Sequence, residues 1–298
     1  MIVDLDGKRV NLPDFFIIGA AKCGTTSLYY YLKQHPKIFM PTVKEPRFFY
    51  YKGIQKSHLN SVGNNIVFTI EDYINLFKKA KEGQIVGEAS PNYLYRYDLV
   101  IPNLKEVYGE KYKKLKIIAI LRNPAERAYS HWLFFKKLNR ENFSFMEAIN
   151  KKERDYIKQG MYHDMVKSYL NEFRYMRIYL FEDLIKDTGG VIKDLFNFLD
   201  VDPNYNVKYE AVVNPSGIPK SEMLVKIINR LNGYFKSVIP DKYKFKFILL
   251  RDKIYKKILY KTKLDNSAKN VLIDIFKEDT LKLQNLINRN LKHWVDKF

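Results

Sequence analysis

The stretch FFIIGAAKCGTTS, residues 15–27, decides the fold that this 298-residue chain can adopt. It begins with the apolar run Phe15–Ile18, which is typical of a strand buried on both faces of a parallel sheet. A turn with glycines at positions 19 and 24 follows, and the pattern from Thr25 to Gln34 indicates a helix. We therefore expect a strand, a glycine-rich loop and a helix N-terminus, in that order.

Strand and helix patterns alternate along the rest of the chain. Strands are expected at 85–87, 115–121 and 176–181, and helices at 71–79, 124–137, 145–151, 162–173 and 190–199. Because such alternation is typical of parallel sheets covered on both faces, we predict a P-loop-like three-layer α/β/α sandwich. Residues 219–298 are basic and helical by pattern, which predicts a helical C-terminal cap on the α/β core, 13–218, within a single domain, 1–298.

The composition indicates a globular protein with an anionic partner. Lys and Arg number 52 against 33 Asp and Glu, a net charge of +19, while 46% of the residues are hydrophobic. This balance excludes a disordered chain, a collagen-like chain and a simple coiled coil, and it favours binding to nucleic acid, a phosphate-rich cofactor, an acidic polymer or a membrane surface. A single cysteine and the absence of a leader pattern or a long apolar run predict a cytoplasmic protein.

The loop at 19–27 has the chemistry of a phosphate site. Backbone N–H groups at a helix N-terminus attract anions, and glycines at 19 and 24 allow a phosphate to approach the backbone closely. The predicted site comprises Lys22, Cys23, Gly24, Thr25, Thr26 and Ser27. It differs from a Walker A loop, in which the lysine follows the second glycine.

A second segment, residues 118–132, reads IAILRNPAERAYSHW. Arg122 stands at the end of a predicted strand, and Ser130 follows about two helical turns later. Together with residues 19–27, this segment resembles the nucleotide-binding motifs of sulfotransferases that use 3′-phosphoadenosine 5′-phosphosulfate (PAPS). The resemblance implies that residues 22–27 bind the 5′-phosphosulfate and that Arg122 and Ser130 bind the 3′-phosphate. Weaker matches at 160–184, 214–221 and 276–294 extend it over 13–298, and the second of them implies that Gly217 and Lys220 reach the nucleotide.

The same resemblance suggests catalytic residues. Residues 43–49, VKEPRFF, resemble the segment of heparan-sulfate-type enzymes that carries a glutamate general base, a role that would fall to Glu45, while Lys22 would act on the transferring group. Residues 88–93, EASPNY, depart from the family pattern E-K-T-P-A-Y, because Ala89 replaces the lysine. Either Lys22 acts alone, or a residue such as Lys44 or Arg47 takes that part. Glu88 is then either a second carboxylate that positions the acceptor or a strand-end residue.

These features predict a PAPS-dependent sulfotransferase that uses no metal and acts on a hydroxyl of a carbohydrate or glycolipid by in-line displacement. Two alternatives remain open. Residues 178–183 have the apolar-then-acidic pattern of a Walker B strand, which would suit a nucleotide-dependent kinase. The charge and the many aromatic residues would suit a nucleic-acid-binding protein, although no motif for one is recognisable. The basic segment 220–263 could form an acceptor cleft, touch an anionic membrane, or be a solvated helix pair.

Overall fold

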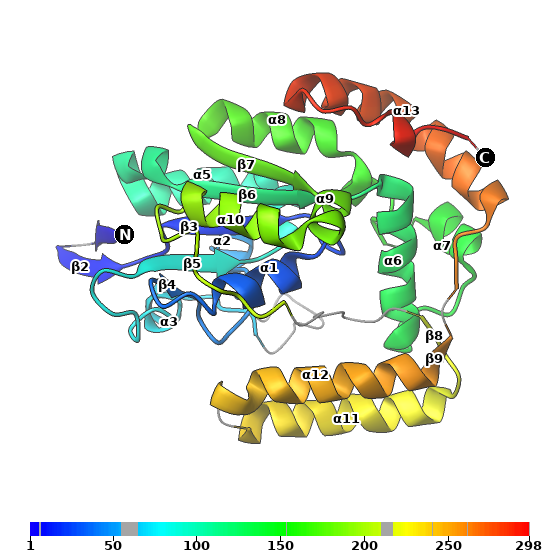
Figure 1. Ribbon diagram of the computed structural model, residues 1–298, viewed down its shortest axis with the longest axis horizontal. Helices are drawn as coiled ribbons and strands as arrows, with labels where there is room; N and C mark the ends of the chain where they lie inside the picture. The colour runs from blue at the N-terminus through cyan, green and yellow to red at the C-terminus, as the bar shows by residue number, and fades with distance from the viewer. Residues whose placement is uncertain are drawn as a thin grey trace. The chain divides into compact units, whose positions relative to one another are not determined.

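The computed structural model describes residues 1–5, 7–54, 65–152, 154–209, 217–239, 241–260 and 262–297. The chain divides into two compact units. The sheet unit comprises residues 1–122 and 163–210, and the helical unit comprises residues 123–162 and 211–298. Figure 1 shows the elements of both units along the chain.

The sheet unit is built on five parallel strands. They are β3 (Phe15–Gly19), β4 (Ile38–Phe39), β5 (Ile85–Ala89), β6 (Lys116–Leu121) and β7 (Tyr175–Leu180). Their order is β4-β5-β3-β6-β7, and every neighbouring pair is parallel. The central strand β3 is buried along its whole length, as its apolar run predicts.

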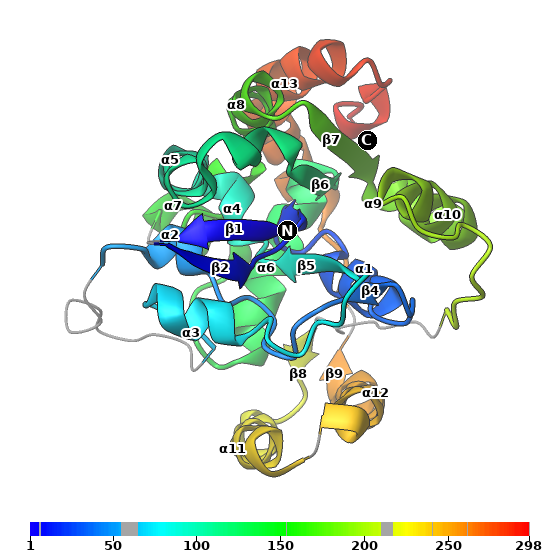
Figure 2. The same cartoon turned by 90° about the vertical axis from the view of Figure 1, so that its left-hand side faces the viewer.

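Helices cover both faces of this sheet. Those of the sheet unit are α1 (Thr25–Leu32), α2 (Phe48–Tyr51), α3 (Ile70–Asn75), α4 (Asn92–Tyr95), α5 (Tyr97–Tyr108), α8 (Tyr162–Glu172), α9 (Phe181–Lys186) and α10 (Thr188–Phe198). Figure 2 shows α1, α9 and α10 on one face, and α2, α4, α5 and α8 on the other. The predicted three-layer α/β/α sandwich is therefore confirmed.

The strand register aligns the ends of the central strands. Phe16 pairs with Glu88 on one side and with Ile117 on the other, and Gly19 pairs with Ala119. Because parallel strands finish at a common edge, the segments that follow β3, β5 and β6 emerge together, where α/β folds bind their ligands. An antiparallel hairpin, β1 (Ile2–Leu5) with β2 (Lys8–Asn11), precedes the sheet and was not expected from the sequence.

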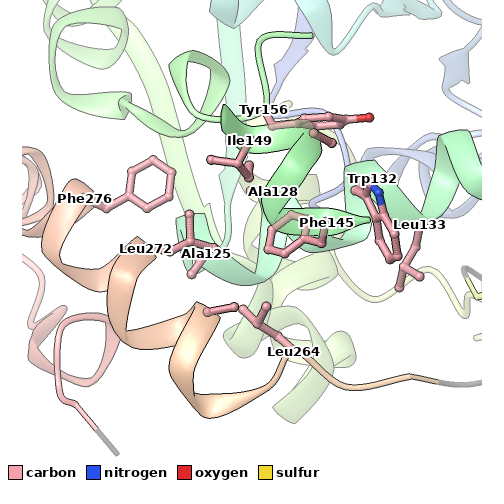
Figure 3. Packing of buried hydrophobic residues seen from close by; sticks show 12 residues of the cluster. Ala125, Ala128, Trp132, Leu133, Phe145, Ile149, Tyr156, Leu264, Leu272 and Phe276 are labelled. Atoms are coloured by element: carbon pink, nitrogen blue, oxygen red, sulfur yellow. The ribbon is translucent and has the colours of Figure 1, made fainter. Parts of the chain in front are cut away.

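The helical unit has its own hydrophobic core. It contains α6 (Pro124–Lys137), α7 (Phe145–Lys151), β8 (Ile218–Pro219), α11 (Glu222–Val238), α12 (Asp241–Ile258), β9 (Leu259–Tyr260) and α13 (Asn266–Ile287). Trp132, Phe145, Leu272 and Phe276 are central members of this core (Figure 3). Residues of the expected cap thus pack against segment 123–162, while the single-domain organisation stays a prediction.

Local signals place the ends of α6 and α7 where the sequence predicts them. The Asn123 side chain accepts hydrogen bonds from the N–H groups of Ala125 and Glu126, and Pro124 occupies the first helical position. At α7, Ser144 and Glu147 form a capping box. Within the described ranges, no helix combines the length and the apolar composition needed to cross a membrane.

Candidate functional site

The loop between β3 and α1 is shaped by its two glycines. A Cβ on Gly19 would lie 2.6 Å from the Cβ of Leu94 and 2.8 Å from the carbonyl oxygen of Pro91, so only glycine fits without displacing the backbone. Gly24 has φ +94°, and a Cβ there would lie 3.1 Å from Phe181 and Leu184. The loop is tied to β6 by the Ala20 N–H, which donates to the carbonyl of Ile120 over 2.8 Å. These constraints hold the backbone close to the start of α1.

Lys22 is the cation of this loop. Its backbone lies in the left-handed region, with φ 72°. Burial lowers the pKa of Lys22 to about 8, although the charge of Glu45 raises it; Arg122 lowers it further. Glu45 and Arg122 are the two ionised side chains that act most strongly on Lys22, so the tertiary structure brings the three predicted site residues into one electrostatic environment.

The remaining loop residues differ in what they can offer a ligand. Thr25 is buried, whereas Thr26 and Ser27 are half-buried on the first turn of α1. Cys23 is fully buried and its Sγ lies 3.7 Å from the carbonyl oxygen of Ala21. The Cys23 side chain therefore faces the protein interior, and its backbone N–H donates to the carbonyl of Ala20 over 3.3 Å.

Glu45 is held by two cations. Its Oε1 lies 2.7 Å from Lys44 Nζ, and its Oε2 lies 2.7 Å from the Arg47 guanidinium. Burial alone would raise its pKa, but the charges and hydrogen bonds of Lys44 and Arg47 prevail and lower the pKa of Glu45 to about 2. The segment is pinned to the sheet by the Glu45 N–H, which donates to the carbonyl of Ala89 over 3.0 Å. Glu45 is thus an ionised carboxylate whose basicity is weak while both cations remain on it.

Glu88 lies in a different environment. Its side chain is fully buried, and Oε2 accepts hydrogen bonds from the hydroxyls of Tyr73 at 2.5 Å and Tyr93 at 3.2 Å. Burial raises the pKa of Glu88 to about 7, although the neighbouring hydroxyls favour the carboxylate. Without any exposed surface, Glu88 cannot touch an acceptor in this conformation, which agrees with a strand-end position rather than with a place in the pocket.

The contacts of Glu88 instead reach the Glu45 segment. Tyr93, which donates to Glu88, accepts a hydrogen bond from the N–H of Phe49 in α2 over 3.3 Å. The neighbouring Ser90 Oγ accepts one from the N–H of Arg47 over 3.2 Å. The buried carboxyl therefore belongs to a network that fixes the backbone on which Glu45 and Arg47 stand.

This network was not foreseen from the sequence. Tyr73 stands 15 residues before Glu88 with no motif between them, so no sequence signal pairs the two side chains. Lys44 and Arg47, the candidate substitutes for the lysine missing at position 89, both form ion pairs with Glu45.

The predicted 3′-phosphate residues fall on both units. Arg122 follows β6 in the sheet unit, with its guanidinium 4.9 Å from the centre of the Phe181 ring. Ser130 is buried on α6, in the helical unit. Gly217 and Lys220 also belong to the helical unit; Gly217 is buried, and the Lys220 ammonium lies 5.3 Å from the centre of the Tyr260 ring. The preceding residues of that motif, 214–216, lie outside the described residues.

Comparisons with known proteins all point to sulfotransferases. The model of the sulfotransferase domain family matches residues 12–232. Human carbohydrate sulfotransferase 15 is 31% identical over 46% of this chain and 30% of its own length. The membrane-associated sulfotransferase kil1 of Dictyostelium discoideum is 25% identical over 97% of this chain and 68% of its own length. Mouse bifunctional heparan sulfate N-deacetylase/N-sulfotransferase 4 is 27% identical over 69% of this chain and 24% of its own length. The match thus spans less than a third of the length of the carbohydrate sulfotransferase and of the heparan sulfate enzyme.

Solved structures agree with this result. A sulfotransferase from Alicyclobacillus acidocaldarius superposes with a TM-score of 0.70 at 26% identity, covering 96% of this chain and all of the other. The sulfotransferase domain of a Synechococcus olefin synthase, at 17% identity and a TM-score of 0.51, shares the fold. Because the family model covers well over half of the chain, and the glycine loop, Arg122 and the parallel sheet are arranged as described above, this protein is an enzyme that belongs to the sulfotransferase domain family.

Proposed function

We propose that this enzyme transfers a sulfuryl group from PAPS to a hydroxyl of a carbohydrate or glycolipid. The observation that carries the proposal is the grouping of Lys22, Arg122 and Glu45 at one edge of the sheet, beside a glycine loop and a helix N-terminus. PAPS, when bound, supplies the sulfuryl group and an adenosine bisphosphate leaving group. The loop suits such a ligand, since it joins a lysine to the N-terminus of a helix, where backbone N–H groups attract phosphate.

Each predicted site residue of the sheet unit then has a distinct role. Lys22 and the N-terminal N–H groups of α1 stabilise negative charge on the 5′-phosphate oxygens. The guanidinium of Arg122 binds the 3′-phosphate, for which its planar fork of donors is suited. For Ser130, Gly217 and Lys220, which belong to the helical unit, nucleotide binding stays a prediction from the family resemblance.

Glu45 accepts the proton of the attacking hydroxyl. A carboxylate with a pKa of about 2 is a poor base, so one of its two cations must move away before it can act efficiently. The acceptor hydroxyl would displace Lys44 or Arg47 from one oxygen of Glu45, and the released cation would then face the transferring group. This exchange would compensate for Ala89 at the position where the family pattern has lysine.

A carbohydrate acceptor is supported by the names of the relatives and by the net charge of the chain. Two of them are described as acting on carbohydrate or on heparan sulfate. The net charge of +19 would attract an acceptor that is anionic or becomes so as sulfation proceeds.

Calorimetric titration with adenosine 3′,5′-bisphosphate tests the donor site. The bisphosphate should bind without added metal, and the binding should be lost in Lys22→Ala and Arg122→Ala. Lys79→Ala, on the exposed surface of the sheet unit, is the matched control and should bind normally. Magnesium-dependent ATP binding in place of bisphosphate binding would favour the kinase, and binding of a single-stranded oligonucleotide would favour the nucleic-acid alternative.

Transfer of labelled sulfate to a panel of polysaccharides and glycolipids tests the acceptor class. With an acceptor in hand, Glu45→Gln should lower kcat by about 10²–10⁴-fold, the usual contribution of a general base. The bisphosphate affinity should stay unchanged in that variant. An unchanged kcat would exclude Glu45 as the base.

A further inference from the structure

The helical pair α11–α12 concentrates the positive charge of the protein. Segment 220–263 contains 13 Lys and Arg against 3 Asp and Glu, a net +10 of the whole chain's +19. The two helices pack on each other through a hydrogen bond of 2.6 Å from the hydroxyl of Tyr255 to Asn229, and Val225 and Tyr255 are buried. The helices α11 and α12 themselves carry 10 of these Lys and Arg and all 3 Asp and Glu, a net +7.

Helix α11 also exposes an apolar stripe. Met223, Leu224, Ile227 and Leu231 are 72%, 49%, 45% and 48% exposed. Spacings of one, three and four residues place these side chains within about 100° of one another around the helix. A helix whose outer face is solvated normally carries polar side chains there. The exposed face of α11 carries large apolar side chains instead.

Helix α12 repeats this arrangement. Tyr243, Leu250 and Ile254 are 48%, 58% and 41% exposed, and their spacings of seven and four residues place them on one face. Lys253 and Lys257 are exposed on the same helix, and Lys226 and Arg230 are exposed on α11. Each helix therefore offers large apolar side chains accompanied by cations.

We propose that the α11–α12 pair binds the surface of an anionic lipid bilayer. The apolar side chains would enter the boundary between headgroups and acyl chains, and the long Lys and Arg side chains would reach the anionic headgroups. An anionic polysaccharide would account for the charge but not for the aliphatic side chains. A second copy of this chain would cover the aliphatic side chains but would bring two segments of net +10 together.

Vesicle sedimentation tests this proposal with the full-length protein. Vesicles of phosphatidylcholine containing about one third phosphatidylserine should bind it, and pure phosphatidylcholine should bind it at least tenfold more weakly. The apolar variant Leu224→Ser/Ile227→Ser/Leu250→Ser and the charge variant Lys226→Gln/Arg230→Gln should each lower binding to the anionic vesicles about tenfold or more. The substituted apolar side chains are at least 45% exposed, so the far-UV circular dichroism should not change.

Matched substitutions in the sheet unit serve as controls. Ile185→Ser replaces an isoleucine that is 66% exposed, and Lys79→Gln replaces an exposed lysine; both variants should bind as the parent does. Binding to heparin without binding to vesicles would overturn the proposal in favour of an anionic polymer. Absence of vesicle binding, with a dimer in sedimentation velocity that the apolar variant abolishes, would overturn it in favour of self-association. Neither result would affect the bisphosphate test above, because the variants used in that test, at Lys22, Arg122 and Lys79, all lie in the sheet unit.

Discussion

Replacing Glu88 by glutamine should remove a pH dependence of stability that the parent protein shows between pH 4.5 and about 7. The carboxyl of Glu88 is fully buried with Tyr73 and Tyr93, and this burial raises its pKa from 4.5 to about 7. Glutamine has nearly the same shape and can still accept the two tyrosine hydrogen bonds, but it does not titrate in this range. The variant thus removes the ionisation and keeps the packing.

The sign and size follow from proton linkage. Between pH 4.5 and about 7 the folded state retains the Glu88 proton that the unfolded chain has released, so the free energy of unfolding decreases as pH rises. The stabilisation is complete below pH 4.5 and is lost above about pH 7. At about 1.4 kcal/mol per pH unit, the parent should lose about 3 kcal/mol across this window on account of Glu88.

Urea unfolding followed by far-UV circular dichroism measures this change at several pH values from 4.5 to 8. The difference between parent and Glu88→Gln isolates one group, because other titrations are common to both proteins. His35, whose pKa is lowered mainly by burial, contributes a change of stability with pH of the opposite sign, in the parent and in the variant alike. Glu45, with a pKa of about 2, contributes stability that is lost only as pH falls below about 4.5.

Glu71→Gln, at an exposed position on α3, is the control, and its stability should change with pH as that of the parent does. Parallel curves for the parent and Glu88→Gln would refute the reasoning.

Three further outcomes are expected. Gly19→Ala should lower the free energy of unfolding in urea by about 2 kcal/mol, because the new Cβ would lie 2.6 Å from a neighbouring side chain. Gly53→Ala, whose Cβ would have nothing within 4 Å, should lower it by only the roughly 1 kcal/mol of positive-φ strain, and equal losses would contradict this reasoning. Calorimetric affinity for the bisphosphate should fall as pH rises through about 8, where Lys22 loses its charge, and Lys22→Arg should abolish that fall. Lys44→Met should raise the pKa of Glu45 above about 2 and move the acid limb of kcat/KM to higher pH; an unmoved limb would show that Glu45 is not the titrating base.

Much of the architecture could be predicted because its signals are local. The apolar run at 15–18 requires a buried strand, and Asn123 with Pro124 defines the start of α6, so the elements at 15–19 and 124–137 agree with their predicted bounds. The N-terminal hairpin and the two-residue strand β4 carry too few residues for a periodic pattern, and their pairing partners determine them.

The sequence by itself determined the parallel α/β class, the glycine loop with Lys22, and the arginine at the end of β6. Only the tertiary structure decided the protonation chemistry of the carboxylates. Glu45 and Glu88 are residues of the same type. Two cations lower the pKa of Glu45 to about 2, whereas burial among tyrosines raises the pKa of Glu88 to about 7. The pKa of a carboxyl depends on which groups from other elements lie within a few ångströms and on how much water reaches it, and neither quantity is encoded in the adjoining residues.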